Sequence, residues 1–242
     1  ATWTGCGGVV PTSADTVVIR GGFTVTVNIT NAAASSLQIG GDPVNGGGVG
    51  ILTFAASGSP ALTVTNGVTV GGNGNTNRTG TITFTSGSTL TAGSVTLGSG
   101  AATPAAGIIT MTAGGTLNTG GLAVNTVTGN TWTPGTGTVV MTATNTLPAT
   151  IFTSFNNLTI SGGTTTLGVA LNSTAAGTLT VKAGATLALS TFSYGATTGL
   201  QGGSSQALHR VSVPVRSLQS RFRKLRFQRA AGRHGLHCGS AV

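Results

Sequence analysis

Apolar and polar residues alternate along residues 1–200, in short runs bounded by glycine, asparagine and serine. Thr24–Val27, Ile82–Thr85 and Leu179–Val181 are clear examples. An alternation with period two, built from threonine, valine and isoleucine, is typical of half-buried β-strands. No segment shows the apolar period of a long amphipathic helix. The pattern therefore predicts an all-β protein.

The strand pattern also repeats at long range. Gly80–Leu90 and Gly107–Leu117 superimpose without a gap, and Gly137–Leu147 and Gly177–Leu187 fit the same frame. A weaker copy begins at Gly50, and the widest interval separates the last two copies. A repeat of roughly 27–30 residues is typical of solenoids, in which each copy stacks on the next.

Each copy carries large apolar residues at the same places. On a strand, the third and fifth positions of the copy point to one side, and most copies add a leucine at the eleventh position. Glycine recurs at the eighth position, where a corner requires a left-handed backbone. The apolar pairs are Leu52/Phe54, Ile82/Phe84, Ile109/Met111, Val139/Met141 and Leu179/Val181, followed by Leu90, Leu117, Leu147 and Leu187, and the glycines are Gly87, Gly114 and Gly184.

A single copy cannot bury this apolar face, whereas stacked copies bury one another. The pattern therefore predicts a parallel β-helix, that is, a β-solenoid whose rungs stack about 4.8 Å apart. The alternative is a β-sandwich, which does not require successive copies to share one inward pattern.

Charged residues are scarce: 5% of the 242 residues, against about a quarter in ordinary soluble domains. Asp15 and Asp42 are the only acidic side chains, so a two-carboxylate glycosidase or a multi-carboxylate calcium site has almost nothing to use. All three histidines follow residue 200, which leaves no credible Ser-His-Asp set. We expect no enzyme activity, no metal and no cofactor. A polysaccharide-binding or polysaccharide-degrading β-helix is the less favoured alternative.

The composition changes abruptly near Gln201. From there on the chain holds eight of its 11 basic residues, whereas threonine disappears. We divide the chain into a β-solenoid over residues 1–200 and a basic tail over residues 201–242. Within the solenoid, residues 1–48 form an N-terminal cap and the first rungs, and residues 49–200 form the repeats.

The basic tail has three open interpretations: a contact with a polyanion, an assembly strand around Val211–Val215, and an end that is foreign to the fold. The polyanion contact would use Arg221, Arg223, Lys224, Arg226 and Arg229. Cys6 and Cys238 could form a disulfide within one chain or between neighbouring chains, or remain free thiols. No apolar run is long enough for a membrane-spanning helix.

Trp3–Gly5 and Gly8–Ile19 resemble the opening of many bacterial secreted β-strand-repeat proteins, and Asn156–Gly163 and Gly177–Val181 resemble their repeat units. These are the autotransporter-passenger and filamentous-haemagglutinin-like surface proteins, and the resemblance covers residues 1–200. It implies a right-handed parallel β-helix, export, and a role in adhesion or extracellular assembly. The basic tail departs from the family pattern.

We therefore expect a bacterial extracellular structural or adhesive protein, secreted or at the cell surface. End-to-end stacking into a filament or matrix is one form of that role, because a solenoid ends in open strand edges. The expected partner is a second copy of the chain, or polymers of the cell surface or matrix, and not nucleic acid.

The alternative function is ice binding, because regular outward threonines resemble the ice faces of some β-solenoid antifreeze proteins. Ile51, Ile108, Val140 and Lys182 interrupt these ranks. The predicted outward face consists of Thr81, Thr83, Thr85, Thr110, Thr112, Thr138, Thr142, Thr178 and Thr180.

Overall fold

The computed structural model describes residues 10–40, 48–72, 78–98, 106–125, 128–195 and 200–202. The chain divides into two units, Ala1–Ser212 and Val213–Val242, and every described residue belongs to the first. All helical or extended structure within the described ranges is β-strand, as the alternating pattern predicts.

Twenty strands follow one another in these ranges. In chain order they are β1 (Thr16–Ile19), β2 (Thr24–Val27), β3 (Ala32–Ala34), β4 (Ser36–Ile39), β5 (Gly50–Phe54), β6 (Ala61–Val70), β7 (Gly80–Thr83), β8 (Thr89–Leu97), β9 (Gly107–Thr110), β10 (Thr116–Thr119), β11 (Leu122–Val124), β12 (Thr131–Thr133), β13 (Thr138–Met141), β14 (Asn145–Thr146), β15 (Ser154–Ile160), β16 (Thr164–Thr166), β17 (Leu171–Val181), β18 (Thr186–Ala188), β19 (Tyr194–Gly195) and β20 (Leu200–Gly202).

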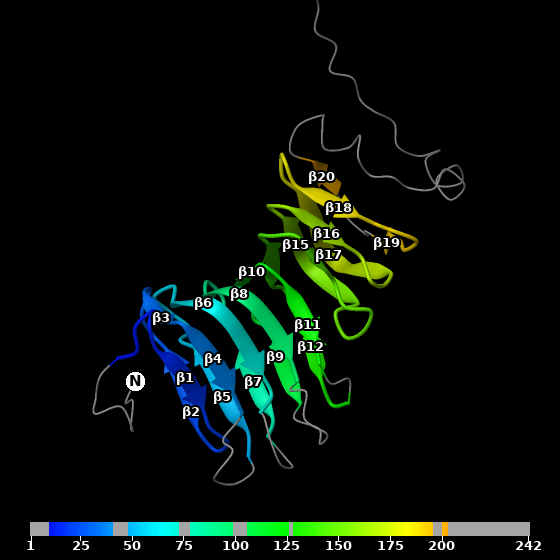
Figure 1. Ribbon diagram of the computed structural model, residues 1–242. Helices are drawn as coiled ribbons and strands as arrows, with labels where there is room; N and C mark the ends of the chain where they lie inside the picture. The colour runs from blue at the N-terminus through cyan, green and yellow to red at the C-terminus, as the bar shows by residue number, and fades with distance from the viewer. Residues whose placement is uncertain are drawn as a thin grey trace, which may run out of the picture. The chain divides into compact units, whose positions relative to one another are not determined.

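The strands form three sheets, in which every pairing between described strands is parallel. Sheet A has the order β1-β4-β6-β8-β10-β13-β15-β17-β19, with β3, β11 and β20 attached to β6, β8 and β17. Sheet B has the order β12-β9-β7-β5-β2, and sheet C has the order β14-β16-β18. Successive coils therefore stack strand upon strand (Figure 1). The predicted parallel β-helix is confirmed, and the sandwich alternative fails because sandwich sheets are antiparallel.

The interior consists of columns of apolar side chains that run through the stack. One column on sheet A contains the buried residues Leu62, Leu90, Leu117, Val139, Leu158 and Leu179, which occupy one register position in successive coils. On sheet B, the rings of Phe54 and Phe84 stack with centroids 5.3 Å apart. Burying one leucine contributes about 1.5–3 kcal/mol. Neighbours in a column belong to different coils, so no coil forms this interior alone.

The predicted inward residues are buried, except for Val181, which is half-buried. The predicted glycine corners are also confirmed. Gly87, Gly114 and Gly184 have φ angles of 76°, 97° and 80°, in the region that residues with a Cβ rarely adopt.

The alignment of the repeats that begin at Gly137 and Gly177 with those that begin at Gly80 and Gly107 is wrong. It places Val139 on Ile109, whereas the structure pairs Val139 with Leu117 on sheet A and pairs Ile109 with Trp132 on sheet B. The same Thr-apolar alternation forms strands on more than one face of the coil. The local pattern therefore identifies an inward residue without identifying the face to which it belongs.

The coils also become shorter along the chain. On sheet A, one coil of the early part leads from Leu90 to Leu117. The later coils, from Val139 to Leu158 and from Leu158 to Leu179, each use fewer residues. The wide interval between the predicted copies at Gly137 and Gly177 therefore contains an additional coil, whose inward residue is Leu158. The predicted repeat length therefore describes the coils from β4 to β10 on sheet A, whereas the first coil, from Val17 to Leu37, is as short as the later ones.

Candidate functional site

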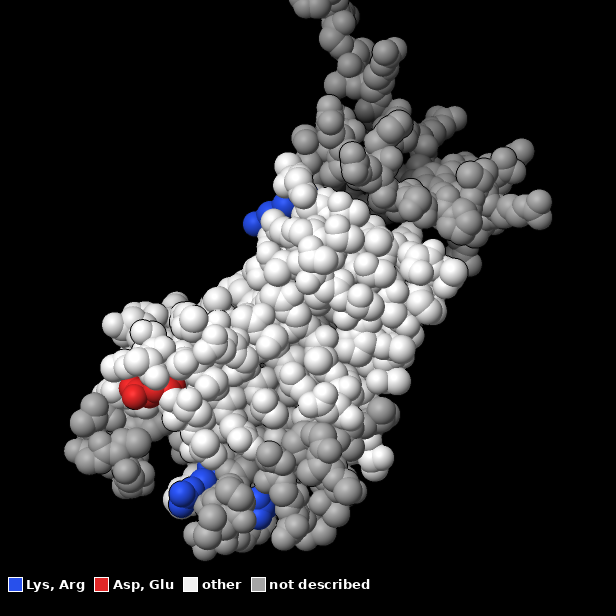
Figure 2. All heavy atoms as spheres, viewed as in Figure 1, with Lys and Arg blue, Asp and Glu red and all other residues white. Residues whose placement is uncertain are grey.

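Charged side chains are few on the part of the chain that the structure describes (Figure 2). Asp15 closes a turn, because the backbone N–H and the hydroxyl of Thr12 both donate to its Oδ2 at 2.8 Å. These hydrogen bonds lower the pKa of Asp15 from its ordinary value. Asp42 lies outside the described residues. Within the described ranges, no three His, Cys, Asp or Glu residues are grouped as a metal site.

The predicted threonine face does not exist as one surface. Thr81, Thr83 and Thr110 lie on sheet B, and Thr138, Thr178 and Thr180 lie on sheet A. The remaining members, Thr85, Thr112 and Thr142, lie just beyond the ends of β7, β9 and β13, respectively. The two groups lie on different sheets because the strand residues that follow Gly137 and Gly177 belong to sheet A, whereas the alignment of the repeats places them with the strands of sheet B.

Sheet B instead carries a longer and more regular rank of threonines. We call the residues Thr26, Thr53, Thr83, Thr110 and Thr133 the threonine ladder, because each pairs in register with the next across all five strands. Two residues earlier on each strand stands the mixed rank of Thr24, Ile51, Thr81, Ile108 and Thr131, which is likewise in register. Both ranks alternate with inward residues, and none of the ten side chains is buried.

Three members of the ladder are absent from the face that the sequence predicts. Thr26 and Thr53 belong to the coils before the clear repeats, and Thr133 lies on a short strand beside Trp132. A signal was present, because Thr26, Thr53, Thr83 and Thr110 follow one another at nearly the interval that separates the clear copies.

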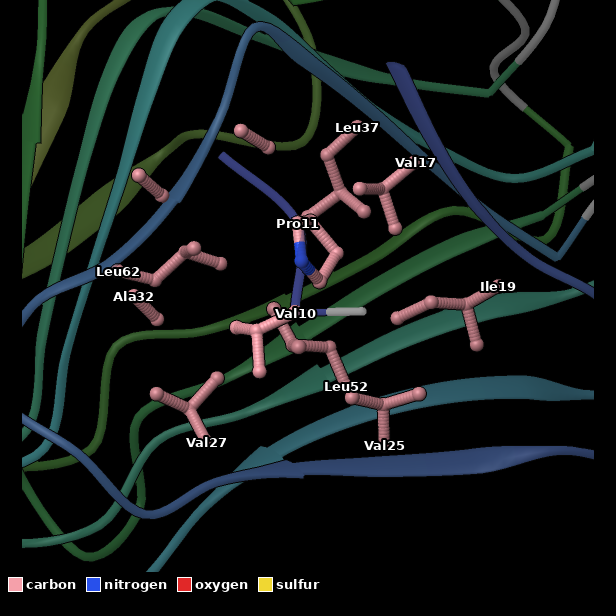
Figure 3. A pocket seen from close by; sticks show the side chains of 12 residues that line it. Val10, Pro11, Val17, Ile19, Val25, Val27, Ala32, Leu37, Leu52 and Leu62 are labelled. Carbon is pink, nitrogen blue, oxygen red and sulfur yellow. The ribbon is translucent and has the colours of Figure 1, made fainter. Parts of the chain in front are cut away.

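A second candidate surface is the N-terminal end of the helix. β1 and β2 are the terminal strands of sheets A and B, and each pairs with only one described strand, β4 or β5. Val18 and Phe23 are 46% and 57% exposed at this end. An apolar hollow lies beside them, where Val10 and Pro11 sit among the inward side chains of the first two coils (Figure 3).

Trp132 and Tyr194 have packing roles. Trp132 is half-buried and lies against the rings of Phe152 and Phe155, with centroids 5.3 and 5.6 Å away, and its indole N–H donates to the Ser154 carbonyl at 2.7 Å. Tyr194 packs against the core, and burial raises its pKa to about 12.

The remaining predicted groups lie outside the described residues: Cys6, Cys238, Arg221, Arg223, Lys224, Arg226 and Arg229. In the described ranges, no helix is long and apolar enough to cross a membrane.

No family model, curated protein or solved structure matches the chain. The class of the protein therefore follows from its own fold, which is a parallel β-helix built from stacked, nearly uncharged coils.

Proposed function

We propose that the chain is an extracellular structural protein of the adhesin type, in which the β-helix serves as a subunit that stacks end to end. The observation that carries the proposal is the N-terminal end, where no described strand pairs with the outer edges of β1 and β2 and an apolar hollow lies at the same end. The resemblance of residues 1–200 to secreted β-strand-repeat proteins supports the same role.

End-to-end stacking would use the same interactions that hold successive coils together within the helix. The column through Leu62, Leu90 and Leu117 shows how one coil covers the apolar face of the next. A second copy placed against β1 and β2 would form main-chain hydrogen bonds with the strand edges that no described strand pairs, and would cover Val17, Val25 and the hollow. Such a contact joins unlike surfaces and so repeats into a filament.

The experiment compares two outward valines. Val18 lies on the edge strand β1, and Val140 lies on β13 inside sheet A, with paired strands on both sides. A lysine on an edge strand discourages pairing with another chain. We expect the unmodified chain to associate as its concentration rises, Val18→Lys to weaken association, and Val140→Lys to leave it unchanged.

Sedimentation velocity over a concentration series measures association, and electron micrographs show whether the assemblies are filaments. Circular dichroism melts establish that both variants fold. Sedimentation with and without reductant separates stacking from a disulfide between chains. A chain that stays monomeric at every concentration, or an equal loss in both variants, would contradict end-to-end stacking.

A further inference from the structure

We propose that the outward face of sheet B binds the surface of an ice crystal through the threonine ladder and the mixed rank. This inference uses a different surface from end-to-end stacking and holds whether or not the chain forms filaments.

The face has the regularity of a lattice. Its five strands pair in parallel with no register shift, whereas the β6–β8 and β15–β17 pairings of sheet A each contain one. Adjacent strands lie about 4.8 Å apart, and two residues along a strand span about 6.6 Å. Equivalent groups therefore repeat in two dimensions, at distances similar in size to the oxygen repeats on the faces of ice.

The side chains on this lattice are stiff. All ten are β-branched, eight threonines and two isoleucines, so χ1 has few accessible rotamers on a strand. Each member presents a methyl group, and every threonine adds a hydroxyl that can donate and accept. Ile51 and Ile108 bring no hydroxyl to the mixed rank, but each presents a methyl group there as the threonines do. Little side-chain freedom is lost when such groups contact a rigid partner.

The chemistry of the face favours ice over other ordered partners. None of the ten positions is charged, so the face contains no ion that would have to give up its liquid hydration shell. None is aromatic either, and Trp132 on β12 turns its indole inward to Phe152 and Phe155. A crystalline polysaccharide would be expected to use aromatic rings as stacking platforms, and this face has none.

A periodic array of weak groups distinguishes a crystal from liquid water. Each hydroxyl or methyl contributes little by itself, and the contributions add only when the partner repeats in phase with the array. Five strands extend over only about 19 Å, so we expect a modest activity per molecule.

The test uses a lysine at the centre of the ladder. Thr83 has Thr53 and Thr110 on either side, so Thr83→Lys inserts a long charged side chain into the middle of the face. Thr159→Lys is the matched control. Thr159 is also half-buried and outward, but it lies on β15 of sheet A.

The measurements are thermal hysteresis and the fraction of protein incorporated into a slowly growing ice hemisphere, at concentrations where the chain is monomeric. We expect the unmodified chain and Thr159→Lys to shape and enter the ice, and Thr83→Lys to fall to the level of a non-binding protein. Circular dichroism melts show that both variants fold.

Absence of hysteresis and of incorporation in the unmodified chain would overturn the proposal, as would an equal loss in both variants. Binding to crystalline cellulose or chitin that Thr83→Lys abolishes, without incorporation into ice, would assign the face to a polysaccharide instead. None of these outcomes depends on Val18, so failure here and failure of end-to-end stacking are separate results.

Discussion

The β-helix contains two regions that share one interior and differ in the length of their coils. The long-coil region covers β1 to β12, residues 16–133, and pairs sheet A with sheet B; its first coil, from Val17 to Leu37, is the one short coil of this region on sheet A before β10. The short-coil region covers β13 to β20, residues 138–202, and pairs sheet A with sheet C. The leucine column on sheet A runs through both. The length of a coil is therefore independent of the register of its inward residues.

In the long-coil region, glycines recur where a strand of sheet B begins close to the backbone that follows a strand of sheet A. Gly40 follows β4 and Gly50 begins β5, and a Cβ on Gly50 would lie 2.6 Å from the Gly40 nitrogen and 2.6 Å from the Ile19 carbonyl oxygen. Only glycine permits two backbones to approach so closely. Gly80 and Gly107 stand in register with Gly50 and repeat the arrangement in the next two coils.

Where the long-coil region ends, a side chain takes the place of a backbone hydrogen-bond acceptor. Gly50 and Gly80 donate to the carbonyls of Thr79 and Ala106 in the following coil, both at 2.9 Å. Gly107 instead donates to the side-chain oxygen of Asn130 at 2.7 Å. The Asn130 amide thus replaces a backbone carbonyl at the place where the coil shortens, and sheet B ends one strand later.

The largest expected loss of stability comes from a substitution where the long-coil region meets the short-coil region. Trp132→Ala removes the ring that packs on Phe152 and Phe155 and should destabilise the fold by about 3 kcal/mol. Because Trp132 links β12 to residues of the short-coil region, we expect calorimetry to show two separate transitions. Trp132→Phe keeps an aromatic ring and loses mainly the hydrogen bond to Ser154, at about 1 kcal/mol. A single transition at the original temperature for Trp132→Ala would show that the regions are not coupled there.

The second largest expected effect comes from replacing a closely packed glycine of the long-coil region. A Cβ on Gly80 would collide with the Ile39 carbonyl oxygen and the Gly71 nitrogen, so Gly80→Ala should cost about 2–3 kcal/mol. Gly121→Ala is the control, since its nearest neighbours would lie 3.7 Å away or farther and its φ is not positive. The urea midpoint measures the loss. In Gly80→Ala, the rate of amide hydrogen exchange should rise in the long-coil region, while β15 and β17 keep their protection. An equal rise in both regions would show that the two regions do not open separately.

The smallest expected effect is a gain in the short-coil region. Thr165 is fully buried in β16 between Asn145 and Leu187, and no described residue accepts from or donates to its hydroxyl. In the long-coil region, by contrast, the buried hydroxyls of Ser88 and Thr119 donate to backbone carbonyls.

Thr165→Val should therefore stabilise the protein by about 1 kcal/mol, because it removes an unsatisfied polar group at nearly constant volume. Thr164→Val, at the half-exposed neighbouring position, should change little. Thermal melts of both variants make the comparison. A loss of stability in Thr165→Val would mean that the hydroxyl has a partner in solution.

The candidate surfaces were only partly accessible from the sequence. The threonines of β7 and β9 stand at positions that alternate with buried residues, and this alternation is a local property of a strand. Their true neighbours, Thr53 and Thr133, were missed because the rank forms only when different coils come into register. The sequence predicts strand edges at the ends of the solenoid in general terms and an N-terminal cap within residues 1–48, whereas the exposed Phe23 and the hollow depend on how the first two coils pack.

By itself, the sequence determined the strands, the inward side chains and the left-handed corners at Gly87, Gly114 and Gly184. Each of these depends on a few adjacent residues, through the period of a strand or the missing Cβ of glycine. The tertiary structure decided which face each strand joins, how long each coil is, and that one threonine of each sheet B strand stands in a single rank. These depend on hydrogen bonding to the preceding coil, and nearly identical Thr-apolar strands fit more than one face equally well.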